Sequence, residues 1–221
     1  MKYELNTELE LQLEIPEEKV VLGGTLFIPD NAQGLVLFAH GSGSSRQSPR
    51  NRFVAQFLNR GSYATLLFDL LTRSEEATDL ITANLRFDID LLSRRLKGAT
   101  DWVLEQSDLK NYGIGYFGAS TGAAAALVAS VGRSEVKAIV SRGGRADMAG
   151  SRLREVTAPS LLIVGGEDYP IIDLNRRALE ELGTAAKEIA IVAGATHLFE
   201  EPGTLDEVSR LAVDWFIRYL H

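Results

Sequence analysis

A serine flanked by glycines follows a buried strand near the middle of the sequence. The residues Gly118-Ala119-Ser120-Thr121-Gly122 come directly after the apolar run 114–117 and precede an alanine-rich segment. In this G-x-S-x-G pattern, a tight strand-to-helix turn lifts the serine hydroxyl clear of the sheet edge, and the glycines let the backbone pass close by. The pattern predicts that Ser120 is a nucleophile. The alternative is a loop that only needs flexible glycines.

A serine hydroxyl needs a base, and the chain has three histidines. His221 is the last residue, and His40 precedes Gly41 in a tight turn, where we expect it to support the loop. His197 follows the last apolar run and precedes the last predicted helix. This position places it at the same sheet edge as Ser120, so we predict that His197 is the base.

A carboxylate that orients the histidine would complete the set. Glu167 and Asp168 are adjacent in a turn after the apolar run 160–164. Adjacent residues on a turn point in different directions. Asp168 is the first choice for the carboxylate and Glu167 is the contender. The order Ser120, Asp168, His197 along the chain is the order expected of α/β-hydrolases.

Two backbone N–H groups must stabilise the negative charge that develops on the substrate oxygen. One is expected from Thr121, directly after the predicted nucleophile. The other is expected from the loop 40–46, which follows the apolar run 35–39 and consists mainly of small residues. Ser42 is the first choice in this loop, and Gly43 is the alternative.

The elements that must position these residues alternate between strands and helices. Segments 9–15 and 19–28 alternate apolar with polar residues, which is typical of antiparallel edge strands with one face in water. Continuous apolar runs follow at 35–39, 63–68, 114–117, 137–140, 160–164 and 188–192, with helical periodicity between Ser48 and Gly61 and over 85–103. A last helix is expected to open with a capping box, Thr204 to Glu207.

This pattern predicts a single α/β domain over residues 1–221. Its sheet should have about eight mostly parallel strands, helices on both faces, an antiparallel N-terminal edge and no large cap. Chemistry in such sheets gathers at the carboxyl ends of the strands, where all the predicted site residues fall.

Composition excludes several classes of protein. A net charge of −7 and a pI near 5.1 argue against nucleic acid or an acidic membrane surface as a partner. Cysteine is absent, and no paired-histidine spacing indicates a metal site. The N-terminus does not resemble a signal peptide, and no apolar run is long enough for a membrane span. We therefore expect a cytoplasmic protein that acts on a small molecule.

Arginine outnumbers lysine seventeen to six. Arg46 follows the small-residue loop and Arg142 follows the run 137–140, so both are expected at the active edge. A guanidinium group binds a carboxylate through two parallel hydrogen bonds, and an anionic substrate held by Arg46 or Arg142 is one hypothesis. The alternative is that these arginines pair with some of the thirty acidic residues.

Four segments together resemble the dienelactone hydrolase-like branch of the α/β-hydrolase superfamily: HGSGSSR, GYFGASTG, GGEDYPI and GATHLF. The resemblance covers roughly residue 24 to the end. It implies the α/β-hydrolase fold and hydrolysis of a small ester, lactone or related acyl substrate through a covalent acyl-enzyme, with no cofactor. Ser120, Asp168 and His197 fall on the family's triad positions.

One departure from the family pattern is the nucleophile itself. The namesake enzymes carry cysteine where this chain has Ser120, so the expectation is a serine esterase-like relative and not an enzyme for dienelactone. Two alternatives stay open. The same triad could transfer the acyl group to an acceptor other than water, and the fold could serve as a non-catalytic receptor or scaffold.

Overall fold

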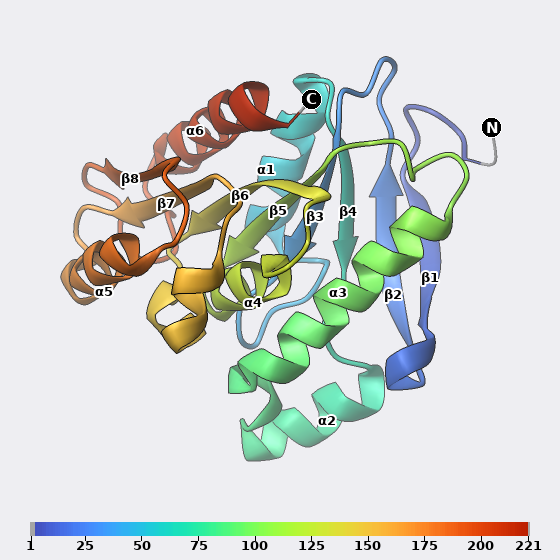
Figure 1. Ribbon diagram of the computed structural model, residues 1–221, viewed down its shortest axis with the longest axis horizontal. Helices are drawn as coiled ribbons and strands as arrows, with labels where there is room; N and C mark the ends of the chain where they lie inside the picture. The colour runs from blue at the N-terminus through green and yellow to red at the C-terminus, as the bar shows by residue number, and fades with distance from the viewer. Residues whose placement is uncertain (1–2, 221) are drawn as a thin grey trace.

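A single eight-stranded sheet organises the chain, and the computed structural model describes residues 3–220 of it. The strand order is β1-β2-β4-β3-β5-β6-β7-β8 (Figure 1). The strands are β1 (Leu9–Ile15), β2 (Val20–Phe27), β3 (Leu35–Ala39), β4 (Ala64–Phe68), β5 (Ile114–Ala119), β6 (Val136–Arg142), β7 (Ser160–Gly165) and β8 (Lys187–Val192). β2 pairs antiparallel with β1 and β4, and all other pairs are parallel. The predicted mixed sheet with an antiparallel N-terminal edge is confirmed.

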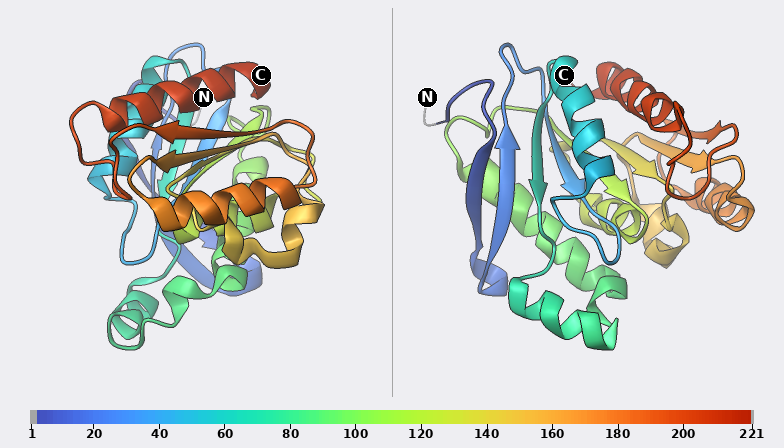
Figure 2. Two further views of the ribbon diagram at one scale, coloured as in Figure 1. Left: turned by 90° about the vertical axis from the view of Figure 1, so that its left-hand side faces the viewer. Right: turned by 180° about the vertical axis from the view of Figure 1, so that it is seen from behind.

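Helices cover both faces of this sheet (Figure 2). One face carries α1 (Pro49–Arg60) and α6 (Thr204–Tyr219), and the other carries α3 (Ile89–Glu105), α4 (Thr121–Ser130) and α5 (Tyr169–Glu181). Every residue of β3, β4, β5 and β7 is buried, whereas β1 alternates along most of its length. Burial on two faces explains why the central strands are continuous apolar runs in the sequence.

Four further elements complete the described part of the chain. These are α2 (Arg73–Thr82) and the 3₁₀ segments η1 (Pro16–Glu18), η2 (Leu85–Phe87) and η3 (Ala146–Glu155). Figure 1 shows α2 beyond the carboxyl ends of β3 and β4, so it overhangs the edge where the predicted site residues lie. None of the helices in the described part of the chain combines the length and the hydropathy that a bilayer crossing needs.

The helix starts show where local sequence signals hold and where they fail. Ser48 caps α1 as predicted, because its hydroxyl accepts the N–H of Asn51 at 3.3 Å. α3 begins at Ile89, four residues later than its periodicity suggests, because the Asp88 carboxylate caps it.

The predicted capping box of α6 is wrong. Gly203, at φ 80°, is the N-cap residue, and Thr204 already lies in the first turn of the helix. The hydroxyl of Thr204 donates to the carbonyl of Glu201 at 2.8 Å. It is therefore committed to the preceding loop, not to the N–H groups that begin the helix.

Candidate active site

Ser120 is the single residue between β5 and α4. Its backbone lies at φ 50° and ψ −120°, a conformation that costs a residue with a side chain about 1–3 kcal/mol. Neighbouring backbone groups hold it there: the Ser120 N–H donates to the Arg142 carbonyl at 3.2 Å, and the Ser120 carbonyl accepts from the N–H groups of Ala123 and Arg145 at 3.1 and 3.0 Å. The turn therefore has the strained geometry of a nucleophile elbow.

Two glycines make this turn sterically possible. A Cβ atom on Gly118 would lie 2.5 Å from the Cα of Ala123, and one on Gly122 would lie 2.2 Å from the carbonyl oxygen of Ala39. Both distances are far inside van der Waals contact with backbone atoms that cannot move aside. The glycines of the sequence pattern are thus required by close packing and not by flexibility.

Asp168 and His197 meet at the same edge of the sheet. β7 and β8 run parallel, so the loops that follow them lie side by side. The Nδ1 atom of His197 is 2.6 Å from the Oδ2 atom of Asp168, whose side chain is largely buried. Glu167 points elsewhere and accepts the hydroxyl of Tyr169 at 2.7 Å. Asp168, and not Glu167, is therefore the carboxylate that contacts the histidine.

Ser120 and His197 both lie against the short segment 142–143. The Ser120 N–H binds the carbonyl of Arg142, and a Cβ atom on the adjacent Gly143 would lie 3.6 Å from the Cε1 atom of His197. Within residues 3–220, no hydrogen bond joins the Ser120 hydroxyl to His197. Such contacts are often long in unliganded enzymes and tighten when substrate binds.

The two predicted oxyanion donors face one cavity. Ser42 and Thr121 both line a cavity of about 50 Å³, together with Gly41 and Gly43. Within residues 3–220, neither the Ser42 N–H nor the Thr121 N–H has a hydrogen-bond acceptor, so both are free to bind a substrate oxygen. The loop also approaches Ser120 directly, since a Cβ atom on Gly41 would lie 3.0 Å from the Cβ atom of Ser120.

His40 supports this loop, as the sequence indicated. Its Nδ1 atom is 3.0 Å from the carbonyl oxygen of Gly41, and its Nε2 atom accepts the N–H of Leu70 at 3.0 Å. The two contacts require a proton on Nδ1 and none on Nε2, which is the neutral ring. Burial lowers the pKa of His40 and favours the same state.

We expect the neutral state of His40 to make stability depend on pH. Because its folded-state pKa is lowered, the stabilisation is present above the unfolded-state pKa of about 6.5 and is lost as the pH falls toward the lower folded-state value. In urea titrations, the free energy of unfolding should fall more steeply between pH 7.5 and 5.5 for the wild type than for His40→Gln. Equal slopes would contradict the assignment.

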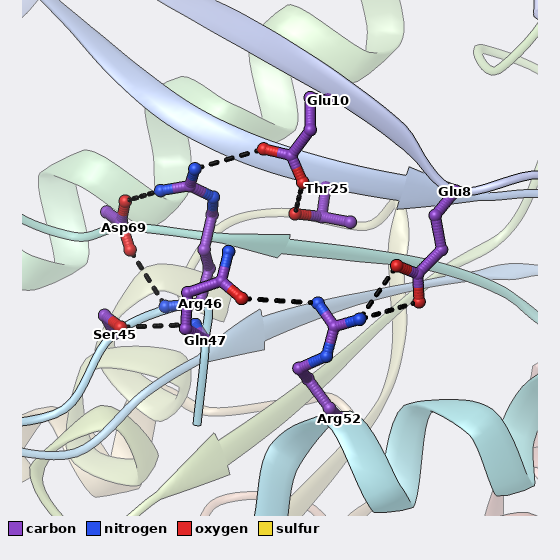
Figure 3. A network of polar contacts seen from close by, with 8 residues as sticks. All are labelled: Glu8, Glu10, Thr25, Ser45, Arg46, Gln47, Arg52 and Asp69. Atoms are coloured by element: carbon purple, nitrogen blue, oxygen red, sulfur yellow. Dashed lines mark hydrogen bonds and ion pairs between the residues drawn. The ribbon is translucent and has the colours of Figure 1, made fainter. Parts of the chain in front are cut away.

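Arg46 is held in an ion-pair network that ties the loop to the sheet (Figure 3). Its guanidinium contacts the carboxylates of Asp69 and, at 3.0 Å, Glu10, and its backbone N–H donates to Asp69 at 2.8 Å. Glu10 also accepts the hydroxyl of Thr25 at 2.7 Å. Two carboxylates thus neutralise Arg46, so its role is ion pairing with acidic residues of the chain and not the binding of an anionic substrate.

Arg142 has different surroundings. It is buried at the end of β6 and donates through Nη2 to the Oδ1 atom of Asn51 at 3.2 Å. Within residues 3–220 it has no carboxylate partner. Arg46 and Arg142, which were both predicted at the active edge, therefore differ in their partners: Arg46 pairs with carboxylates and Arg142 with an amide oxygen.

The far wall of the cavity comes from the segment around α2, which was not predicted from the sequence. Leucine side chains form much of this wall, from Leu70, Leu71, Leu80 and Leu92, and Arg86 lies at the same cavity. Asp79 fixes this segment by accepting the Leu85 N–H at 2.7 Å and the Nε–H of Arg86 at 2.6 Å. The capping box Thr72-x-x-Glu75, which the structure forms, is the signal that could have predicted α2.

His221 lies outside the described residues. Within residues 3–220, no group of three or more histidine, aspartate or glutamate side chains is arranged to hold a metal ion. The groups that this edge offers for chemistry include Ser120, His197, Asp168 and the free backbone amides.

Comparison with known proteins shows the family to which this chain belongs. The profile of the Dienelactone hydrolase family matches residues 22–216. The crystal structure of a dienelactone hydrolase from Anabaena variabilis is 56% identical, covers 97% of this chain and 99% of that chain, and superposes with a TM-score of 0.94. An esterase from Pyrococcus furiosus shares the fold at 17% identity, with a TM-score of 0.75 over 97% of this chain and 92% of that chain.

A curated relative is longer than this chain. A putative phosphoribosyl transferase of Mycobacterium tuberculosis is 51% identical over 210 residues, which is 95% of this chain and 46% of that protein. The chain thus spans about half the length of the curated relatives that it matches.

Proposed function

Because the chain belongs to the dienelactone hydrolase family, we propose that it is a serine hydrolase that cleaves a small ester, lactone or related acyl substrate. The observation that carries the proposal is the 2.6 Å contact between His197 and Asp168, at the sheet edge where Ser120 follows β5. An oriented imidazole beside a serine elbow is the arrangement that activates a hydroxyl for attack on an acyl carbon.

The proposed reaction has two half-reactions. The Ser120 oxygen attacks the acyl carbon while His197 takes its proton, and the N–H groups of Thr121 and Ser42 stabilise the oxyanion. His197 then gives the proton to the leaving alcohol, and the acyl group remains on Ser120. Water attacks this ester with His197 as base, His197 returns the proton to the Ser120 oxygen, and the acid is released. Asp168 stabilises the imidazolium in both halves, and the steps need no cofactor.

A fluorophosphonate probe tests the proposal most directly. The active serine should form a covalent adduct, and mass spectrometry of the peptides should place the added mass on Ser120. A non-catalytic receptor or scaffold would give no adduct. Prior heat denaturation of the protein serves as a control, since it should abolish specific labelling.

Acyl transfer to another acceptor would use the same residues. Titration of released acid against released alcohol separates the two reactions, because hydrolysis gives one acid per alcohol whatever else is present. A shortfall of acid that grows with added glycerol would favour a transferase. The name of the M. tuberculosis relative describes a protein about twice as long, and we do not extend phosphoribosyl transfer to this chain.

The cavity beside the free amides predicts a preference for short acyl groups. Its 50 Å³ has room for about three or four water-sized groups, which corresponds to an acetyl to butyryl chain. Among p-nitrophenyl esters we expect kcat/KM to be highest for acetate to butyrate and at least about tenfold lower for octanoate.

Two neighbouring residues of α2 provide a matched pair of variants for this prediction. Leu80 lines the cavity and is 74% exposed, whereas the adjacent Ile81 is 89% exposed and is not among the lining residues. Leu80→Ala should shift the preference toward longer chains, and Ile81→Ala should leave it unchanged. A wild-type maximum at octanoate would contradict the assignment of the cavity.

A further inference from the structure

One short loop touches both Ser120 and His197. It runs from Arg142, the last residue of β6, to Arg145, the residue before η3, and we call it the spacer loop. The Arg142 carbonyl accepts the N–H of Ser120 at 3.2 Å, and the Arg145 N–H donates to the Ser120 carbonyl at 3.0 Å. A Cβ atom on Gly143 would lie 3.0 Å from the carbonyl oxygen of His197 and 3.6 Å from its Cε1 atom. Because the loop contacts both residues, its position affects the distance between them.

Gly144, in the middle of the spacer loop, packs closely against α4. A Cβ atom on Gly144 would collide with the hydroxyl of Ser141 and would lie 2.6 Å from the Cβ atom of Ala123. The spacer loop leads into η3, which packs against both α4 and α5 (Figure 1). The loop therefore has no room to move toward α4.

Asn175 reaches the same glycine from α5. Its Nδ2 group donates to the Gly144 carbonyl at 2.8 Å and to the Ile171 carbonyl, one turn earlier in α5, also at 2.8 Å. The two bonds use both amide hydrogens and fix the direction of the side chain. α5 begins directly after Asp168, whose carbonyl accepts the N–H groups of Ile171 and Ile172 at 3.0 Å each. The amide thus connects the helix that follows Asp168 to the loop that holds Ser120.

The Asn175 amide is unfavourable to bury. The residue has no exposed surface, and within residues 3–220 its Oδ1 atom has no hydrogen-bond donor. A buried polar atom without a partner destabilises the folded state, and a leucine of similar volume would fill this space without that cost. An asparagine at this position therefore calls for an explanation other than packing.

We propose that Asn175 is a positioning residue that sets the distance between the Ser120 hydroxyl and the His197 imidazole. The inference rests on the proposed function, in which His197 takes the proton of Ser120. Within the described part of the chain, the imidazole is bonded to Asp168 and not to the Ser120 hydroxyl, so the last approach must come when substrate binds. A misplacement of 1 Å can lower a rate by about 10²-fold. The hydrogen bond from Asn175 limits such misplacement by holding the spacer loop.

Replacement of Asn175 by leucine tests this role. Asn175→Leu removes both hydrogen bonds and nearly keeps the side-chain volume. We expect kcat for p-nitrophenyl acetate to fall by about 10–100-fold and KM to change by no more than about twofold, because both half-reactions slow and no substrate contact is lost. The rate constant of fluorophosphonate labelling should fall by the same factor, since labelling also needs an activated Ser120. A folded Asn175→Leu variant with the wild-type kcat would overturn the proposal.

Asn59 provides a matched control at the opposite edge of the sheet. It lies on α1 and donates through Nδ2 to the Tyr63 carbonyl and to the Thr65 hydroxyl, each at 3.0 Å, near the amino end of β4. Asn59→Leu makes the same chemical change, so it should lower the urea concentration of half-unfolding and keep the wild-type kcat. An equal loss of kcat in the two leucine variants would show a general effect of destabilisation, and the positioning role would be overturned.

A second variant separates hydrogen bonding from shape. Asn175→Asp keeps the shape of the side chain but offers at most one hydrogen where the amide offers two, so it cannot satisfy both carbonyls. We expect kcat to fall by at least about tenfold in this variant as well. Circular dichroism reports folding. If neither variant folded, Asn175 would be a structural residue and the proposal would be overturned.

The positioning role and the proposed function fail in different ways. If the wild type hydrolyses p-nitrophenyl acetate and both Asn175 variants are as fast, only the positioning role is overturned. If the wild type neither hydrolyses the ester nor forms a fluorophosphonate adduct on Ser120, the proposed function itself is overturned.

Discussion

Ser120→Ala is expected to lower the kcat for short esters by about 10⁵–10⁶-fold and to abolish fluorophosphonate labelling. The variant keeps the imidazole, the carboxylate and the free amides but has no oxygen to attack the acyl carbon. Residual turnover would come only from bound water and the oxyanion donors. The measurement is the initial rate of p-nitrophenyl acetate hydrolysis, corrected for the uncatalysed rate. Ser151→Ala, at an exposed position, is the matched control and should keep the wild-type rate.

The strained backbone of Ser120 leads to a second prediction, in which activity and stability change in opposite directions. At φ 50°, glycine is unstrained where serine is not. Ser120→Gly should therefore be as inactive as Ser120→Ala and yet more stable than the wild type, by roughly 1 kcal/mol in urea unfolding. An active Ser120→Gly variant would show that the nucleophile lies elsewhere.

Asp168→Asn is expected to lower kcat by about 10⁴-fold, as in serine proteases that lose the corresponding carboxylate. Asparagine can hold the ring only with the wrong nitrogen protonated, and it cannot stabilise the imidazolium. The prediction rests on the 2.6 Å contact between the Asp168 carboxylate and Nδ1 of His197. The loss should appear in kcat at saturating ester, and circular dichroism should show that the variant is folded.

Glu167→Gln is the matched control for that variant, since it makes the same chemical change one residue earlier. Glu167 accepts a hydrogen bond from Tyr169 and does not contact the histidine. Its replacement should change kcat by no more than a few-fold. If Glu167→Gln proved the more damaging of the two, the assignment of the orienting carboxylate would have to be reversed.

Much of the fold could be predicted because burial leaves a direct trace in the sequence. β3, β4, β5 and β7 are apolar at nearly every position, since helices cover them on both faces, and β1 alternates because one face is wet. The N-cap of α1 at Ser48 could be predicted from the local sequence Ser48-Pro49 alone. The capping box predicted at Thr204 did not form, because the preceding loop binds the same hydroxyl: it donates to the Glu201 carbonyl.

The part of the site that depends only on residue types and their order along the chain could be predicted. The glycines around Ser120 and the position of His197 after the last strand follow from residue types and the direction of the strands, so sequence sufficed to propose them. The choice between Glu167 and Asp168 did not follow, because it depends on how one turn directs two adjacent side chains. α2 and its leucines were missed because their role depends on where an overhanging helix packs.

The order of the buried strands, and the groups that follow their carboxyl ends, can be read from the amino-acid sequence. Which charged groups form ion pairs cannot, because it depends on tertiary packing. Arg46 is neutralised by Asp69 and by Glu10, which is 36 residues away along the chain. Arg142 meets Asn51, 91 residues away, and gains no counter-charge from residues 3–220. The two differ because the burial of a strand shows in its own apolar residues. The pairing of charges depends instead on distances between segments that only folding brings together.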